Sequence, residues 1–427
     1  MLDLKFVREN AELVRSNAAN RNVSVDLDLI VSLYDRRSDL IQRVENTRAQ
    51  RNTNASRMKA KLSDEERTRL VAEGKNLKST IASLEEELAD VETQLTQAAE
   101  ALPNMTHPSS PVGDDESANR ELEQIGTRPS FDFTPKDHVA LGTDLDIVDF
   151  DTATKVSGTK FYFLRNEGVF LELALTRFAL DLLQQRGFTP MITPDIARVD
   201  IVSGIGFQPR GPESNIYTLE HEDTALVGTA EITLGGYYAG QTLDRAQLPI
   251  RLAGLSHCFR REAGASGQFS KGLYRVHQFT KVEMFILSHP DDSDRIHNEM
   301  LEIEKEIFTS LGLPFRVVDI CTGDLGGPAY RKFDLEAWMP GRGDGGEWGE
   351  ITSTSNCTDF QSRRLGIRYK DSDSGQRGFV HLLNGTAVAV SRAIIAILEH
   401  YQRADGSVVM PEALRRYTGF ESIPPRR

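Results

Sequence analysis

Residues 272–285 read GLYRVHQFTKVEMF, and side chains able to bind a ligand stand at every second position of this run. These positions are held by Arg275, His277, Phe279, Lys281 and Glu283. Because successive side chains of a β-strand point to opposite faces, the spacing predicts a strand with one functional face. Just upstream, HCFRREAG at 257–264 places Arg260 and Glu262 two residues apart. With the glycine-rich stretch 264–272 between them, the two runs predict an antiparallel hairpin.

The chemistry of this hairpin suits a nucleotide. Arginine can hold phosphate through two hydrogen bonds, and an aromatic ring can stack on a base. A surface hairpin laced with salt bridges would show the same residues, so the hairpin alone leaves both interpretations open. Further downstream, HLLNGTAVAVSRAIIAILEHY at 381–401 predicts a strand, an Asn-Gly turn and a helix. Arg392 lies in the first turns of that apolar helix, where a ligand phosphate or a buried salt bridge would have to balance its charge.

The rest of the downstream sequence predicts an α+β domain. Short β-rich runs lie at 160–164, 248–255, 285–287, 315–320 and 379–381, and helical stretches lie at 170–186, 294–311 and 388–400. Strands and helices do not alternate strictly, which favours an antiparallel sheet flanked by helices. Upstream, LPNMTHPSSPVGDDES at 102–117 contains three prolines and predicts a linker.

Residues 28–101 contain no proline and one glycine, and they predict a helical hairpin. Two series recur every seven residues in its second half, namely Leu70, Leu77, Leu84, Val91 and Ala98, and Ile81, Leu88, Leu95 and Leu102. This is the seam of a coiled coil. A weaker seam of Leu29, Leu33, Leu40, Val44 and Met58 precedes it. Ser63, followed by three acidic residues, reads as the turn and N-cap between two antiparallel helices.

The tip of this hairpin is basic. Residues 43–78 hold ten Lys or Arg and five Asp or Glu, in a chain whose net charge is −13. Arg37, Thr47, Arg51 and Asn54 fall on or beside the seam of the first helix, so a dimerisation coiled coil would be poorly apolar there. A phosphate-binding tip and a solvated charged face remain equally open from composition alone.

Composition narrows the class of protein. The chain has 427 residues, enough for two or three units, with 39% hydrophobic and 26% charged residues. Three cysteines without a C-x-x-C pair favour a reducing compartment over a disulfide scaffold. No apolar run approaches the length of a membrane span, and the N-terminus has no signal-peptide pattern. The G-x-G-x-x-G match at 341–346 is expected to be a flexible loop, because no strand or helix is expected around it.

These runs resemble motifs of the class II aminoacyl-tRNA synthetases, and in detail those of seryl-tRNA synthetases of bacterial or organellar type. FRREAG with RVHQF and KVEMF is similar to motif 2 of that class, and NGTAVAVSR is similar to motif 3. GFTPMITP at 187–194 resembles motif 1, whose dimer-interface proline would be Pro194. VGTAEI at 227–232 resembles the serine-binding loop of the family. With the linker and the N-terminal MLDLKFVREN, the resemblance covers essentially the whole chain in order.

The resemblance implies a helical arm over 1–102 (coiled coil about 28–101), a linker over 103–130 and a catalytic domain over 131–427. It implies ATP and Mg²⁺ as cofactors, and L-serine and tRNA-Ser as substrates, with tRNA-Sec charged where that RNA is present. A homodimer is implied, with no membrane partner. The cytoplasm is expected, or an organellar matrix if a transit peptide was removed.

The family's site residues carry over onto matching positions. The implied catalytic residues are Arg260, Arg392 and Glu350. The implied serine contacts are Thr229, Ala230, Glu231, Arg260, Glu283, Asn384 and Thr386, with the ammonium on Glu283 and the hydroxyl on Thr386. The implied ATP contacts are Arg260, Arg261, Glu262, Arg275, Val276, Phe279, Glu350, Ile351, Thr352, Ser353 and Arg392. Glu350 and Ser353 would hold Mg²⁺. Arg43, Arg48, Arg51, Arg57, Lys59 and Lys61 would contact tRNA.

The sequence departs from the family pattern at a few places. Thr352 stands where serine is usual, Thr354 where cysteine is common, and Ser391 where glycine is frequent, and the loop at 341–349 is longer than usual. Two alternatives remain beside the main interpretation. One is a serine-activating ligase that loads another acceptor, such as a carrier protein, although such relatives lack the arm. The other is an inactive homologue that serves as a binding module, although Arg260, Glu283 and Arg392 are all present.

Overall fold

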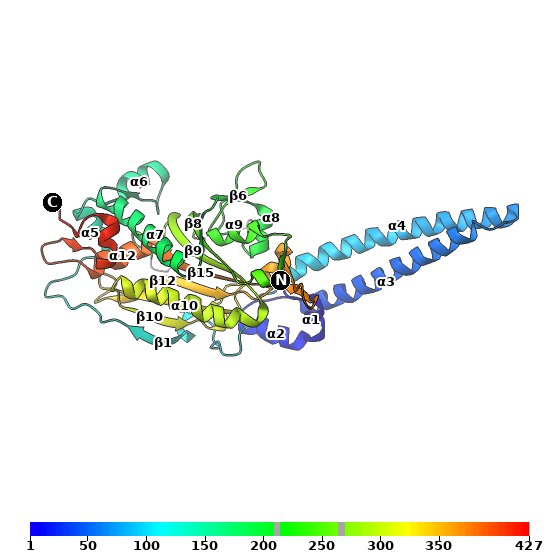
Figure 1. Ribbon diagram of the computed structural model, residues 1–427, viewed down its shortest axis with the longest axis horizontal. Coiled ribbons are helices and arrows are strands. Elements are labelled where there is room, and N and C mark those ends of the chain that lie inside the picture. Colours follow the sequence, from blue (N-terminus) through cyan, green and yellow to red (C-terminus); the bar gives the residue numbers. More distant parts are fainter. Residues whose placement is uncertain (209–213, 264–269, 427) are drawn as a thin grey trace. The chain divides into compact units, whose positions relative to one another are not determined.

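The computed structural model describes residues 1–208, 214–263 and 270–426, which form two compact units, Met1–Met105 and Thr106–Arg427 (Figure 1). The stretch 264–269 of the expected glycine-rich loop lies outside the described residues. The first unit is helical and the second is a mixed α/β unit, as expected for an α+β protein. Among the described residues, no helix has the length and apolar character needed to cross a bilayer.

The first unit is a long antiparallel helical hairpin with two short helices before it. Its helices are α1 (Leu4–Glu9), α2 (Ala11–Asn20), α3 (Leu27–Arg57) and α4 (Asp64–Glu100). Ser63 caps α4 in a capping box with Glu66, which confirms the turn expected at this position. The seam buries Leu40 and Val44 of α3 against α4. Leu29 was wrongly placed in this seam, because its side chain is 46% exposed and Ile30 is buried instead.

The second unit is built on a sheet with strand order β1-β10-β11-β12-β15-β9-β8-β4. The bounds are β1 (Arg120–Ile125), β10 (Phe315–Asp319), β11 (Arg331–Met339), β12 (Glu347–Asn356), β15 (His381–Ala389), β9 (Gln278–Ser288), β8 (Ile250–Phe259) and β4 (Thr189–Ile192). All neighbours pair antiparallel except β4 and β8, which are parallel. The predicted hairpin is therefore present as β8 and β9, next to the edge strand β4.

Helices pack on this sheet through two apolar clusters. The larger one joins the sheet to α5 (His138–Asp144), α7 (Glu167–Gln185), α10 (Ser293–Ser310) and α12 (Val390–His400). The smaller one joins it to α8 (Val199–Ile205), α9 (Ala230–Tyr237) and α11 (Phe360–Leu365). The remaining elements are small: α6 (Phe150–Ser157), α13 (Glu412–Thr418), β2 (Val148–Asp149), β3 (Phe163–Leu164), β5 (Ile196–Arg198), β6 (Thr224–Leu226), β7 (Thr242–Asp244), β13 (Arg368–Lys370), β14 (Arg377–Phe379), β16 (Val408–Val409) and β17 (Ser422–Ile423).

Three local expectations were wrong. Asn384 and Gly385 do not form a turn, because β15 runs straight through them between β12 and β9. The stretch at 341–346 is preceded by a strand, since it joins β11 to β12 in a β-hairpin. Residues 120–125, inside the expected linker 103–130, form the edge strand β1. In each case, pairing within the sheet overrides the local signal.

Candidate active site

A cavity of about 340 Å³ opens where β9, β11, β12 and β15, with the segment that follows β8, meet the first turns of α9 and α12. It is lined by Phe207, Thr229, Glu231, Arg260, Glu262, Tyr274, Arg275, Val276, Phe279, Lys281, Glu283, Lys332, Glu350, Ile351, Thr352, Ser353, Asn384, Thr386, Ala389, Ser391 and Arg392. Almost all of the sequence-derived candidates of the catalytic unit are therefore brought together from segments far apart in the chain.

Two candidates, Ala230 and Arg261, are not among the described residues that line this cavity. Ala230 is fully buried as the first residue of α9, beneath Thr229 and Glu231. Arg261 is exposed, and its backbone N–H donates to the carbonyl of Asn215 at 2.9 Å. Lys281 lines the cavity, as its place on the functional face of the predicted strand suggested, although it was not among the candidate contacts. Sequence reasoning missed other lining residues, among them Tyr274 and Lys332. The local sequence offers no signal for Lys332, because its pairing with Asp334 in β11 is that of an ordinary ion pair.

One end of the cavity is formed by the end of the β8–β9 hairpin. β8 ends at Phe259, so Arg260 and Glu262 lie beyond the strand, and Glu262 has a positive φ of 49°. The Arg260 guanidinium donates from Nε to the carbonyl of Gly228 at 3.1 Å and lies 5.3 Å from the ring centroid of Phe279. Glu262 pairs with Arg275 at 3.2 Å. Cationic groups and an aromatic ring thus face the same space.

The other end of the cavity is rich in buried carboxylates. Glu283 forms a buried ion pair with Lys281, and the Thr386 hydroxyl lies 3.4 Å from the Glu283 carboxylate. Glu231 accepts hydrogen bonds from Gln361 at 2.6 Å and from Asn384 at 2.9 Å. Burial, together with the charge of Glu283, raises the pKa of Glu231 to about 7. A small cation with a hydroxyl group would find matching partners here.

Between the two ends, Glu350 meets Arg392. The Arg392 guanidinium lies 3.0 Å from the Glu350 carboxylate and donates to the Glu350 carbonyl at 3.1 Å. Burial opposes ionisation of Glu350, but Arg392 and then Lys332 outweigh it and hold the pKa of this carboxyl at about 2. Glu350 is therefore an anion at neutral pH, available to a cation in the cavity.

A break in strand pairing lets Glu350 and Ser353 serve the same cavity. Side chains three apart in a regular strand point to opposite faces. The register of β11 and β12 shifts between Leu335 and Glu336, where Thr352 and Glu350 are the respective partners. Such a bulge offsets the alternation. Carboxylate and hydroxyl oxygens are the ligand types that Mg²⁺ prefers, so these two residues fit the implied metal.

Two of the positions that depart from the family pattern, Thr352 and Thr354, form hydrogen bonds through their hydroxyl groups. Thr352 donates to Glu304 at 3.1 Å, and Thr354 donates to the carbonyl of Asn384 at 3.2 Å. Burial raises the pKa of Glu304 well above its ordinary value. Ser391 is buried and lines the cavity beside Arg392. A hydroxyl at each place is compatible with the packing.

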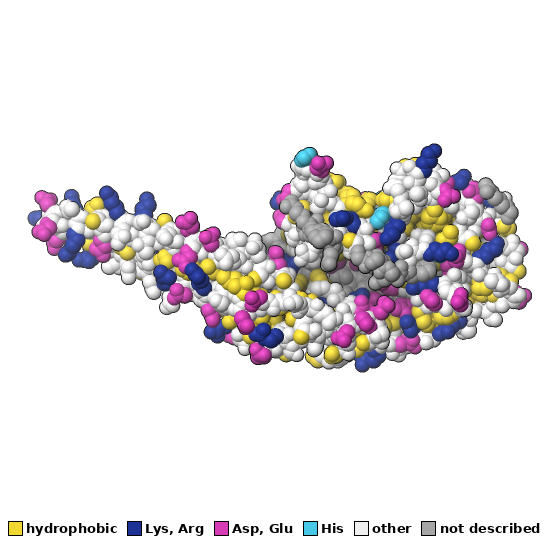
Figure 2. Space-filling view, turned by 180° about the vertical axis from the view of Figure 1, so that it is seen from behind, with side chains coloured by type: hydrophobic (Ala, Val, Ile, Leu, Met, Phe, Trp, Pro, Cys, Tyr) yellow, Lys and Arg dark blue, Asp and Glu magenta, His cyan; other side chains and the backbone are white. Residues whose placement is uncertain are grey.

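The arm residues divide into two groups. Arg43 pairs with Asp39 at 3.7 Å and Arg48 pairs with Glu85 at 2.7 Å. Within the described part of the chain, no ion pair forms at Arg51, Arg57, Lys59 or Lys61. In Figure 2, Lys and Arg side chains gather toward the tip of the arm, with Asp and Glu among them. The tip thus offers cations that no carboxylate of the arm neutralises by direct contact.

Known proteins resemble both units. Residues 217–401 match the family "tRNA synthetase class II core domain (G, H, P, S and T)", and residues 1–106 match "Seryl-tRNA synthetase N-terminal domain". A serine–tRNA ligase of Treponema denticola is 60% identical over 99% of this chain and 100% of its own. One of Rubrobacter xylanophilus is 56% identical over 100% of both chains. The crystal structure of seryl-tRNA synthetase from Pyrococcus horikoshii complexed with ATP has a TM-score of 0.92 at 40% identity and covers 100% of both chains.

Proposed function

Since this chain belongs to the seryl-tRNA synthetase family of class II aminoacyl-tRNA synthetases, we propose that its cavity activates L-serine with ATP and charges tRNA-Ser. A single arrangement carries this proposal. One cavity holds Glu231, Glu283 and Thr386 at one end, Arg260 and Arg275 with Phe279 at the other, and Arg392 between them. The first set suits an ammonium and a hydroxyl, and the second suits a base and its phosphates.

In the first step, a carboxylate oxygen of serine attacks the α-phosphorus of ATP, and the bond to pyrophosphate breaks. The protein supplies position and charge rather than a covalent partner. Arg260 holds the α-phosphate, Phe279 stacks on adenine, and Arg392 holds the outer phosphates. In the second step, a hydroxyl of the terminal ribose of tRNA attacks the seryl carbonyl, and AMP leaves.

Glu350 and Ser353 are proposed to hold Mg²⁺. When bound by these two residues, the ion would supply positive charge that offsets the charge of the phosphates. In the described structure, Glu350 is paired with Arg392 at 3.0 Å. The carboxylate therefore has to share its charge between the arginine and the ion, which its low pKa of about 2 allows.

The serine hydroxyl is proposed to bind Thr386, whose side chain is buried beside Glu283 and Lys281. A site that hydrogen-bonds a substrate hydroxyl can reject analogues without it by about 10⁴–10⁵. Glycine and alanine would leave these buried polar groups without a partner. The carrier-protein alternative is less favoured, because the N-terminal family match and the long arm are both present.

The direct test is ATP–pyrophosphate exchange with single amino acids, followed by charging of total tRNA with labelled serine. Serine should support exchange and incorporation, and glycine, alanine and threonine should not. Serine-dependent exchange without transfer to tRNA would favour another acceptor. If none of the amino acids supports exchange, the binding-module alternative would be favoured.

Serine use should fall as the pH drops below about 7. Glu231 must be anionic to support Glu283 in attracting the serine ammonium, and the pKa of Glu231 is raised to about 7 by burial and by Glu283. We expect kcat/KM for serine to fall by up to about tenfold per pH unit below that value. A carboxyl with a raised pKa stabilises the fold below its ordinary pKa of 4.5 and loses that contribution as the pH rises through 7. Acid unfolding through this residue therefore cannot explain the loss.

The matched variant is Glu231→Gln, which keeps the shape and cannot titrate. Its activity at pH 8 should be lower, and its profile between pH 6 and 8 should be flat. A profile with the same midpoint as the wild-type enzyme would assign the titration to another group. Serine-independent ATP binding, measured over the same pH range, serves as the control.

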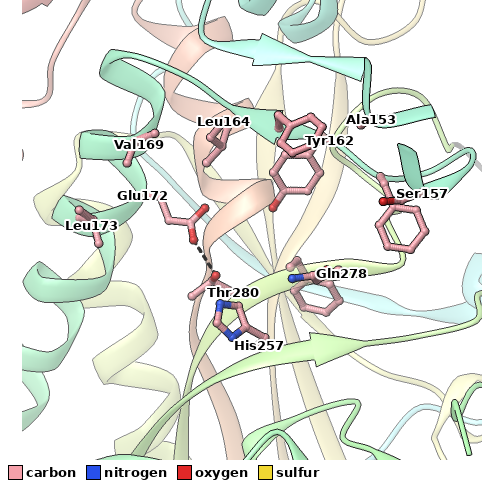
Figure 3. A pocket seen from close by; sticks show the side chains of 13 residues that line it. Ala153, Ser157, Tyr162, Leu164, Val169, Glu172, Leu173, His257, Gln278 and Thr280 are labelled. Atoms are coloured by element: carbon pink, nitrogen blue, oxygen red, sulfur yellow. Dashed lines mark hydrogen bonds between the residues drawn. The ribbon is translucent and has the colours of Figure 1, made fainter. Parts of the chain in front are cut away.

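A homodimer is also proposed, through the surface around α7. Phe170 and Leu173 are 54% and 60% exposed there, and Phe163 is exposed beside them. A cavity of about 370 Å³ opens at this surface, lined in part by Val169, Leu173 and the hydrogen-bonded pair Glu172 and Thr280 (Figure 3). Exposed apolar patches of this kind mark association surfaces. Sedimentation of the full chain with and without Leu173→Asp tests the assignment.

A cytoplasmic location is also proposed. The three cysteines are free and buried, as is usual for proteins of a reducing compartment.

A further inference from the structure

Two arginines from different segments contact one aromatic ring beside the active site. The guanidinium carbon of Arg392 lies 4.8 Å from the ring centroid of Tyr274, and that of Arg342 also lies 4.8 Å from it. Arg392 and Tyr274 line the proposed ATP cavity, whereas Arg342 does not among the described residues. Arg342 instead lines an adjoining cavity of about 670 Å³, which shares Tyr274, Arg275, Lys332 and Glu350 with the first. Tyr274 thus stands between Arg342 and the substrate space.

The loop that carries Arg342 is fixed rather than loose. The Arg342 side chain is only 16% exposed, and Nε lies 3.0 Å from the Glu347 carboxylate. A Cβ atom at Gly349 would stand 2.7 Å from Arg342 Nη1, so glycine at this position leaves room for the guanidinium. The N–H of Gly341 donates to Glu399 at 2.9 Å. The longer loop at 341–349 therefore delivers one particular side chain to Tyr274.

The same carboxylate, Glu399, also holds the segment that carries Tyr274. Its other oxygen accepts from His138 Nδ1 at 2.8 Å, and His138 Nε2 accepts from the N–H of Leu273 at 3.2 Å. All of this network is buried, because His138 and Glu399 are each 1% exposed. Glu399 thereby holds the two segments that carry Arg342 and Tyr274. It lies in α12, the same helix as Arg392.

We propose that Arg342 is a positioning residue for ATP, which acts through the Tyr274 ring on Arg392. The inference rests on the proposed function and extends it to a residue outside the substrate cavity. Cation–π contact fixes the ring against one guanidinium and presents it to the other. Two guanidinium groups on one ring also repel each other, and the polyanionic phosphates of ATP relieve that repulsion. Arg342 therefore favours the arrangement that binds phosphate, and it has no such link to the serine end.

The first test is Arg342→Gln in serine-dependent exchange. We expect KM for ATP to rise about three- to tenfold, as loss of a partly buried cation–π contact predicts, with KM for serine changed less than about twofold. Arg128→Gln is the matched control, because Arg128 stacks on Trp338 at 4.1 Å in the same hairpin region, and the described residues show it on the two tryptophans and not on Tyr274. It should leave both constants unchanged. Equal rises in both constants for Arg342→Gln would overturn the proposal.

The second test is a double-mutant cycle with Tyr274→Leu. If Arg342 acts through the ring, Arg342→Gln has no further effect on KM for ATP once the ring is gone. A full effect in the Tyr274→Leu background would mean direct contact with substrate and would overturn the proposal. Tyr274→Phe keeps the ring and should preserve the effect of Arg342→Gln.

ATP binding without serine separates this inference from the proposed function. The chain has two tryptophans, Trp338 and Trp348, whose rings lie 5.2 Å apart on the strands that flank the Arg342 loop. Their fluorescence should therefore report ATP binding at this place. A dissociation constant for ATP that rises in Arg342→Gln supports the inference whatever amino acid is activated. An unchanged constant overturns it, even if serine-dependent exchange is intact.

Discussion

Replacing Arg260 by alanine should reduce serine-dependent ATP–pyrophosphate exchange by about three orders of magnitude. A cation that stabilises charge developing on a transferred phosphoryl group is worth about 10³–10⁵ in rate. Arg260 is preorganised for this task, because its Nε is held by the Gly228 carbonyl and its charge faces Phe279. A rate lower by a factor of about 10³ corresponds to a loss of about 4 kcal/mol of transition-state stabilisation.

The loss should appear mainly in kcat, since the charge that Arg260 meets develops during transfer. The matched control is Arg251→Ala, which removes an arginine from β8, the strand that leads into Arg260. Arg251 pairs with Glu299 at 2.7 Å and does not line the active-site cavity as described. Near-wild-type exchange by Arg260→Ala would contradict the assigned role. An equal loss in both variants would point to damage to β8 rather than to chemistry.

Much of the site could be predicted because chemistry and strand alternation point the same way in β9. Phe279, Lys281 and Glu283 follow the period of two and all face the cavity. Lys332 could not be selected in this way, since it comes from β11, which reaches the cavity only through pairing with β12. Its side chain sits 3.1 Å from Asp334, so a local reading sees an ordinary ion pair.

Arg261 stays a prediction that the lining of the described cavity does not include. It lies next to Arg260 in a run that resembles motif 2, and sequence neighbours of a binding residue are natural candidates. Beyond Phe259 the chain leaves the strand, and Glu262 adopts a left-handed φ of 49°. The backbone turn separates the two neighbouring arginines, which only the tertiary structure defines. The Asn384-Gly385 pair failed for a related reason, because two neighbouring strands hold it extended.

The helical hairpin was easier to predict than the site, because a long heptad pattern, a capping residue and the absence of proline all indicate the same structure. Only the ends of the weaker seam were misplaced, as at Leu29. The arm's function is a different matter, because charge alone left RNA binding and a solvated face equally open. The structure sharpens that question by separating arginines already paired with acids, such as Arg48 with Glu85, from those at the tip that are not.

Removing the arm should therefore separate the two halves of the reaction. Deletion of residues 28–101 should leave serine-dependent exchange within about twofold, since the catalytic unit has its own apolar core. Charging of tRNA-Ser should fall by at least about 10²-fold, because several phosphate contacts are lost together.

A finer variant neutralises the free tip cations by Arg51→Gln, Arg57→Gln, Lys59→Gln and Lys61→Gln. Each phosphate contact removed should lower the slope of log affinity against log salt by about one unit.

The control for the tip variant removes arginines that already face carboxylates. Arg36 and Arg37 pair with Glu87 and Glu92 at 2.7 and 2.9 Å. Their replacement by glutamine removes positive charge from the same helix but few phosphate contacts. The slope of log affinity for tRNA against log salt should therefore change little. If both variants lose affinity equally, the arm attracts RNA by its overall field rather than by its tip. If neither loses affinity and the deletion charges normally, the arm has no part in recognising tRNA.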